Sequence, residues 1–66
     1  MDKYVFAFED IDSLFIAVHD VRIHFFSLHP VSDIEKLQMT ISVSELNPEI
    51  TYICRVIENA GGKCIA

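Results

Sequence analysis

Residues 37–44, LQMTISVS, and residues 47–62, NPEITYICRVIENAGG, decide the fold. In the first stretch apolar and polar side chains alternate without a break, which is typical of a β-strand with one face on a core and the other in water. The second stretch has the apolar spacing of a helix, with Asn47 as its N-cap and a proline after it. Gly61 and Gly62 favour a left-handed stop. The sequence therefore predicts a strand followed by a helix.

Shorter strands are predicted at both ends of the chain. Residues 3–9, KYVFAFE, are aromatic and β-branched and are bounded by charged residues, as strands often are. Their apolar side chains fall on both faces, which is typical of a central strand. Residues 63–66, KCIA, follow the two glycines and are predicted to form a short last strand.

Residues 11–28 allow two interpretations. Apolar residues at positions 11, 14, 18, 21, 25 and 28 fit one continuous amphipathic helix. Residues 21–26, VRIHFF, are instead dominated by strand formers, and His19-Asp20 suits a turn. We expect a helix over residues 11–20 and a strand over residues 22–28, with the continuous helix as the alternative.

The predicted second strand has consequences for the residues in and after it. Phe25 and Phe26 would point to opposite faces of the sheet, which would leave one aromatic ring exposed. Pro30 ends the strand, because proline disfavours helix before it and cannot donate to a ladder. Residues 32–35, SDIE, have the spacing of a capping box and suit a single helical turn.

The predicted elements describe one α+β domain over residues 1–66. Their order is strand, helix, strand, strand, helix, strand. This is the ferredoxin-like βαββαβ plan, in which an antiparallel sheet carries both helices on one face. Because such folds host many functions, function has to be argued from the site.

Composition excludes several classes of protein. The chain has 66 residues, five basic and ten acidic, with a net charge of −5 and 52% hydrophobic residues. This apolar content excludes a disordered chain, and the acidic balance argues against a nucleic-acid partner. Residues 14–28 are the most apolar stretch, but charged residues and histidines interrupt it, so we expect no membrane span. The N-terminus lacks the features of a secretory signal, so we expect a cytoplasmic protein.

Two cysteines, Cys54 and Cys64, are spaced by ten residues, which fits neither a zinc site nor a redox CxxC pair. We expect both thiols to be reduced, with Cys54 filling the core and Cys64 more accessible on an edge strand. No disulfide or metal then stabilises this short domain. We therefore expect oligomerisation, in the first instance as a homodimer.

From residue 9 to residue 66 the chain resembles an ACT domain, the small regulatory module of amino-acid-metabolism enzymes and regulators. The resemblance is carried by LQMTISVS as third strand, NPEITYICRVIENAGG as second helix and KCIA as last strand. Residues 10–14, DIDSL, lie where the family has an Asp-x-Pro-Gly-x-Leu loop, and residues 21–24, VRIH, lie where it has a Gly and an apolar stretch. Both family glycines and the loop proline are absent from this chain.

The ACT resemblance implies a non-enzymatic regulatory module that senses a small ligand, an amino acid, at a dimer interface. It implies that Asp12 and Ser13 bind the amino group and polar end of the ligand, and that Asp20 or Arg22 closes the site of the neighbouring subunit. The expected ligand-binding set is Asp10, Asp12, Ser13, Asp20, Arg22 and Ile23. The same residue types also have structural interpretations, with the aspartates as helix caps and Arg22 as a solvated charge on an edge strand.

A second hypothesis is a small acidic protein-interaction factor that inhibits or adapts a larger cytosolic protein and has no small-molecule site. The short chain, the missing family glycines and the charge of −5 support it. Neither hypothesis involves catalysis, a cofactor or a metal. His19, His24 and His29 are spaced by five residues and have no cysteine or carboxylate neighbour at ligand spacing.

Overall fold

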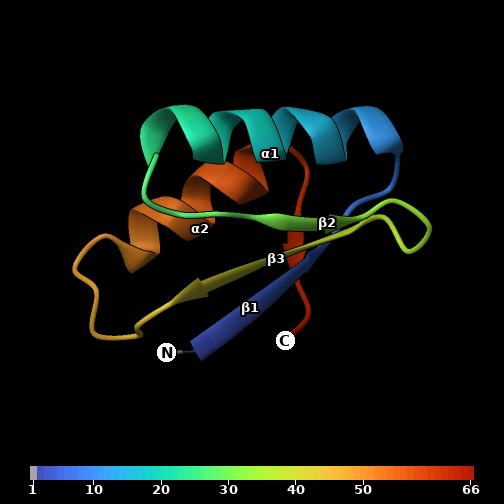
Figure 1. Ribbon diagram of the computed structural model, residues 1–66. Helices are drawn as coiled ribbons and strands as arrows, with labels where there is room; N and C mark the ends of the chain where they lie inside the picture. Colours follow the sequence, from blue (N-terminus) through green and yellow to red (C-terminus); the bar gives the residue numbers. More distant parts are fainter. Residues whose placement is uncertain (1) are drawn as a thin grey trace.

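The computed structural model describes residues 2–66 and has the element order β-α-β-β-α-β (Figure 1). The elements are β1 (Asp2–Ala7), α1 (Ile11–His24), β2 (Val31–Asp33), β3 (Gln38–Val43), α2 (Ile50–Asn59) and β4 (Lys63–Cys64). The strands form one four-stranded sheet in the order β2-β3-β1-β4, and every neighbouring pair is antiparallel. Both helices lie on the same side of this sheet (Figure 1). The predicted α+β class, antiparallel sheet and central first strand are confirmed.

The structure corrects the expectation for residues 11–28. Helix α1 continues through Asp20 to His24, so the predicted break near Asp20 and the strand over residues 22–28 are wrong. The alternative of one continuous helix is right as far as His24. The Phe25 N–H donates to the Val21 carbonyl and closes the last turn. Packing of the inner face of α1 overrides the strand preference of VRIHFF.

The second strand lies later in the chain than predicted. β2 (Val31–Asp33) follows Pro30 and pairs with β3 in a hairpin. The predicted helical turn over residues 32–35 is therefore wrong. The Asp33 carboxylate accepts a hydrogen bond from the Lys36 N–H at 3.1 Å, and Leu37 adopts a positive φ of 53°. The residues that suit a capping box also suit a hairpin turn, because in both the Asp side chain accepts a hydrogen bond from a nearby backbone N–H group.

The two adjacent phenylalanines lie in the connection between α1 and β2 and not on the sheet. Phe25 is buried in the core, whereas Phe26 is 85% exposed. The expectation of an aromatic ring on the open sheet face is therefore wrong. One ring of the pair is exposed, but it lies at the end of α1.

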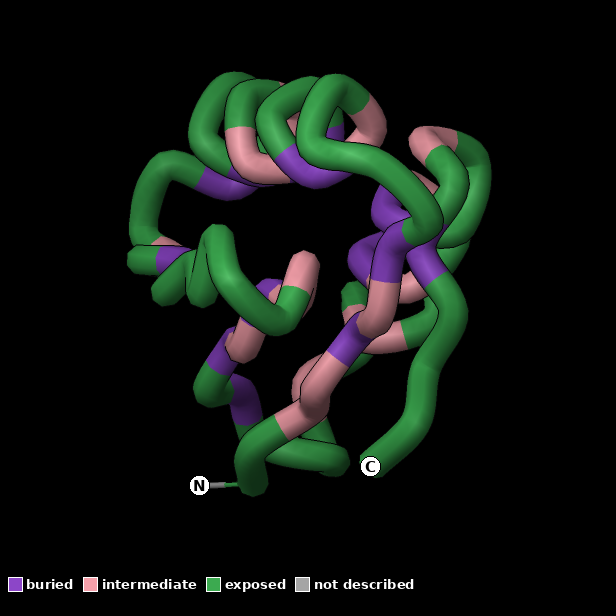
Figure 2. The backbone as a smooth tube through the Cα atoms, turned by 90° about the vertical axis from the view of Figure 1, so that its right-hand side faces the viewer, coloured by how far each residue is buried: buried purple, intermediate pink, exposed green. Residues whose placement is uncertain are grey.

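The core lies between the sheet and the two helices (Figure 2). Of the four apolar residues that alternate in residues 37–44, Met39, Ile41 and Val43 are buried in the core and Leu37 is only partly buried. Helix α2 contributes Ile53 and Ile57. The buried residues are Phe6, Phe8, Leu14, Ala17, Val21, Phe25, Met39, Ile41, Val43, Ile53 and Ile57.

The predicted stop of α2 is confirmed, whereas the predicted N-cap, Asn47, is wrong because Glu49 occupies that position. The Asn47 side chain accepts a hydrogen bond from the Glu49 N–H at 2.8 Å, so it caps a turn that precedes the regular helix. The helix itself begins at Ile50, three residues after Asn47. Gly61 has a φ of +108°, which confirms the predicted left-handed stop.

Gly62 allows β4 to approach the core. A methyl group at this position would lie 2.7 Å from Ile57 Cγ2 and 2.8 Å from Phe8 Cζ. We expect Gly62→Ala to lower the free energy of unfolding by about 1–3 kcal/mol, because the buried side chains have to move. Thermal denaturation followed by circular dichroism measures the change, with exposed Ser42→Ala as the control. An unchanged melting temperature would contradict this packing.

Candidate functional site

The first turn of α1 holds three of the predicted ligand-binding residues. Asp10 is the N-cap, and its carboxylate accepts a hydrogen bond from the Ser13 N–H at 2.7 Å. The backbone and side chain of Ser13 lower the pKa of Asp10 by hydrogen bonding to its charged form. Asp12 is exposed, and Ser13 is partly buried. The capping interpretation therefore accounts for Asp10, whose carboxylate is occupied by its own helix.

The other three predicted residues, Asp20, Arg22 and Ile23, lie in the last two turns of the same helix. They do not lie at a junction between a helix and a strand, so their predicted placement is wrong. Asp12 and Arg22 are ten residues apart on α1, which separates them by about 15 Å along the helix axis. One copy of the chain therefore does not bring the six predicted residues together.

Helix α1 exposes apolar side chains on its outward face in addition to those that it buries on its inward face. Phe15, Ile16 and Ile23 are 49%, 53% and 61% exposed. Figure 2 shows α1 at the surface of the molecule, with buried positions on its inner side and exposed positions on its outer side. We call these three residues, together with Asp12, His19 and Arg22, the outward face of α1, because His19 lies on the same side of the helix between Ile16 and Ile23. It is convex, whereas small-molecule sites are usually concave.

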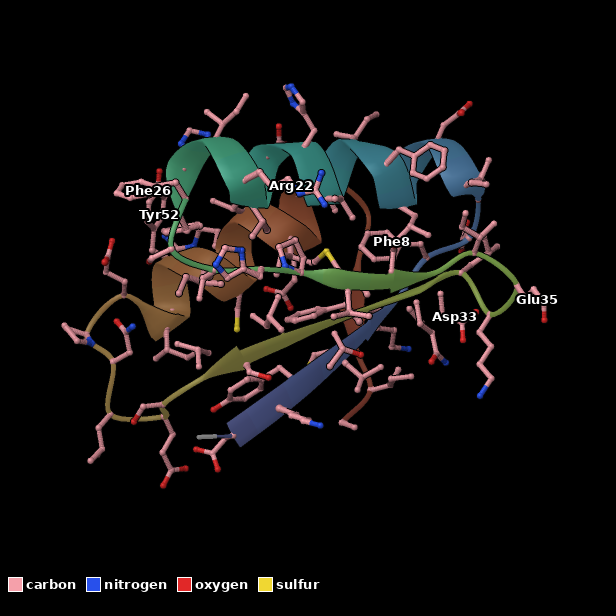
Figure 3. All side chains as sticks on the ribbon, viewed as in Figure 1. Phe8, Arg22, Phe26, Asp33, Glu35 and Tyr52 are labelled. Atoms are coloured by element: carbon pink, nitrogen blue, oxygen red, sulfur yellow. The ribbon has the colours of Figure 1, made fainter. Side chains whose placement is uncertain are left out.

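A hollow of about 130 Å³ lies where α1 ends above the start of α2. The residues that line it are His24, Phe25, Phe26, Ser27, Leu28, Asn47, Glu49 and Ile53. The Phe25 ring is 5.3 Å from the Tyr52 ring, in an edge-to-face arrangement. Figure 3 shows Phe26 and Tyr52 at this end of the molecule. Sequence reasoning missed the hollow, because its two halves lie about twenty positions apart in the chain.

The opposite end of α1 is acidic. Glu9, Asp10 and Asp12 lie at the start of the helix, and Figure 3 shows Asp33 and Glu35 in the β2–β3 hairpin at the same end of the molecule. Across residues 2–66, no group of His, Cys, Asp or Glu side chains has a geometry that would hold a metal ion. We therefore treat the acidic end as a source of long-range charge.

The two thiols differ in exposure in the way the sequence predicted. Cys54 is partly buried on α2, and Cys64 is exposed on β4. Burial raises the pKa of the Cys54 thiol, and the nearby Cys64 and Glu58 raise it further. A raised pKa reduces the thiolate fraction at neutral pH, so Cys54 is poorly suited to nucleophilic chemistry.

Comparisons with protein-family models, curated proteins and solved structures found no match to this chain. The ACT resemblance therefore stays a prediction from the sequence pattern. Neither helix within residues 2–66 has the length and apolar character needed to cross a membrane.

The lowered pKa of Asp10 predicts a pH-dependent contribution to stability. As the pH falls through the usual aspartate range, the unfolded chain takes up a proton at Asp10 before the folded chain does. The stabilisation is therefore complete above that range and is lost as the pH falls through the folded pKa. We expect Asp10→Ala to lower the melting temperature by a few degrees at pH 7, because the cap is lost.

The difference between the wild type and Asp10→Ala should shrink as the pH is lowered towards 3, as followed by thermal melts at each pH. Asp10→Asn is the matched control, because a neutral amide still caps the helix without titrating. A difference between wild type and Asp10→Ala that stayed constant with pH would show that the Asp10 charge does not contribute.

Proposed function

We propose that the chain is a non-enzymatic interaction module with the ferredoxin-like βαββαβ fold, and that it forms a homodimer through the outward face of α1. The observation that carries this proposal is the exposure of Phe15, Ile16 and Ile23 on one helix. Single exposed apolar residues are common on protein surfaces. Several on one helix face are typical of a contact surface.

The contrast between the two helices supports a partner for α1. The outer side of α2 carries mainly polar and charged residues, including Thr51, Arg55 and Glu58. α1 has apolar residues on its outer and inner sides alike. Large apolar side chains gathered on the outer side of a helix are typical of a surface that a partner covers. A second copy is an economical partner, because a domain of this size has a marginal core of its own.

Charge favours one arrangement of the two copies. Asp12 lies in the first turn of α1 and Arg22 in the last turn, and both are exposed. A parallel pair of α1 helices would bring like charges together. An antiparallel pair about a two-fold axis places Asp12 of each copy near Arg22 of the other, and it also aligns the helix dipoles favourably. Ile16 then lies near the axis.

The dimer would use Asp12 of each copy but leave the rest of each acidic end, including Asp33 and Glu35, and both sheets free. With a charge of −5 for each copy, such a dimer is attracted to basic protein surfaces. The function that follows is that of an acidic adaptor or inhibitor of a larger protein. The outward face of α1 would supply assembly, and the remaining surface would supply partner binding.

We expect sedimentation velocity to give a mass twice that of the 7.5 kDa chain at micromolar concentration. Ile16→Glu should weaken the dimer about 30-fold or more, because a charge would be buried near the axis. Ile65→Glu is the matched control, since Ile65 is also an isoleucine about half exposed but lies after β4. A monomeric wild-type protein would overturn the proposed dimer.

Charge reversal tests the antiparallel arrangement. Arg22→Glu alone should weaken the dimer, because it would oppose Asp12 of the second copy. The double variant Asp12→Arg/Arg22→Glu should restore it, because the pair is exchanged and not removed. Equal weakening in the single and double variants would contradict the antiparallel pairing.

A second candidate function is the sensing of an amino acid at the dimer interface. The observation that favours it is the placement of Asp12 and Arg22 at opposite ends of α1. In the antiparallel dimer a carboxylate of one copy and a guanidinium of the other would lie close together. These two groups complement the ammonium and carboxylate of a free amino acid.

A thermal-shift screen against the twenty amino acids tests this second candidate. A ligand at about 100 times its dissociation constant stabilises the folded state by about 2.7 kcal/mol, which raises the melting temperature of a domain of this size by about 10–20 °C. The shift should disappear in Arg22→Gln, whereas Arg55→Gln on the outer side of α2 should retain it. If no amino acid raised the melting temperature, the sensing of an amino acid would be contradicted.

A further inference from the structure

The residues that line the hollow at the end of α1 include three aromatic ones and one acidic one. His24, Phe25 and Phe26 come from the end of α1 and its connection to β2, and Glu49 comes from the N-cap of α2. Phe26 is 85% exposed, so its ring faces solvent and is not packed in the core. Aromatic faces and a carboxylate together are the groups that bind an organic cation.

The Glu49 carboxylate is available for a ligand. The ion pair found within residues 2–66 joins His19 and Asp20, and the Glu49 side chain makes no cap hydrogen bond to its own helix. The backbone N–H groups of Glu49 and Ile50 are already bonded to Asn47. Glu49 therefore places an exposed carboxylate without an intrahelical partner at the start of α2, where it offsets the partial positive charge of the helix N-terminus.

The other side of the hollow also favours a cation. α1 ends here, with Phe25 as its C-cap, and the carbonyl end of a helix carries a partial negative charge. The net charge of −5 adds a favourable long-range field for a positively charged group.

Size limits the group that can enter. The hollow measures about 130 Å³, and drug-sized ligand pockets are usually two or more times larger. A cavity of about 150 Å³ can hold benzene, and a guanidinium group has fewer heavy atoms than benzene. A guanidinium is also planar, so it can stack on an aromatic ring while its edge bonds a carboxylate.

We propose that the hollow receives an arginine side chain of a basic partner protein, with the guanidinium stacked on Phe26 and hydrogen bonded to Glu49. This inference rests on the proposed interaction module and names the chemistry of its partner. The hollow lies at the end of α1, beside Tyr52, and not on the outward face that forms the dimer (Figure 3). The arginine and the second copy therefore occupy different surfaces.

Titration of the ¹⁵N-labelled protein with a capped Gly-Arg-Gly peptide tests the proposal. We expect amide shifts confined to residues 24–28 and 47–53, with weaker binding of the corresponding Gly-Lys-Gly peptide and none of Gly-Gln-Gly. Glu49→Gln should weaken binding of the arginine peptide about tenfold, because a charge-assisted hydrogen bond is lost. Phe26→Ala should also weaken it, by removing the stacking surface.

Two variants serve as controls for charge and for apolar surface. Glu58→Gln removes a carboxylate from the same helix outside the hollow, and Leu46→Ala removes an apolar side chain that is 87% exposed beside it. Both should bind the arginine peptide as the wild type does. Equal binding of the arginine and lysine peptides, or equal loss in Glu58→Gln and Glu49→Gln, would overturn the proposal.

The same titration on Ile16→Glu separates this proposal from the proposed dimer. Arginine-peptide binding that persists in Ile16→Glu supports the hollow whatever the assembly state of the protein. A dimeric wild type that gives no shifts with the arginine peptide overturns the hollow and leaves the dimer standing.

Discussion

The rest of the structure depends on the packing of the inner stripe of α1 against the sheet. Leu14, Ala17 and Val21 are fully buried, and they share the core with Met39 and Ile41 of β3. Only a helix brings residues with this spacing to one side, so α1 has to continue past Asp20. A strand starting near residue 22 would break this stripe. Burial of one such side chain contributes about 1.5–3 kcal/mol.

The position of α1 determines where the remaining elements lie. Because the helix runs to His24, residues 25–30 have to cross back to the sheet, and β2 begins only after Pro30. Phe25 reaches the core from this connection, while Phe26 stays exposed beside the start of α2. The same packing that buries Val21 therefore creates the hollow and leaves the outward face of α1 uncovered.

The two surfaces differ in what they can bind. The outward face of α1 is convex and carries three exposed apolar side chains around His19, with a charge of each sign near its ends, which suits a second copy of the same face. The hollow is small, and the residues that line it include aromatic ones and Glu49, which suits a single cationic side chain. Assembly and partner binding would therefore be separate properties of one small domain.

By itself the sequence determined the elements with strong local patterns. The alternation in residues 37–44 predicted β3, and the spacing and glycines of residues 47–62 predicted α2. The aspartates of residues 10–14 were candidate helix caps, and the structure shows that Asp10 is the cap. Only the tertiary structure decided the course of residues 11–28, the place of β2 and the hollow, which joins two distant segments. The physical reason is that the whole scale of strand propensities spans only about 1 kcal/mol and depends on context. Burial of Val21 and Phe25 contributes about 1.5–3 kcal/mol for each side chain and depends on contacts with distant residues.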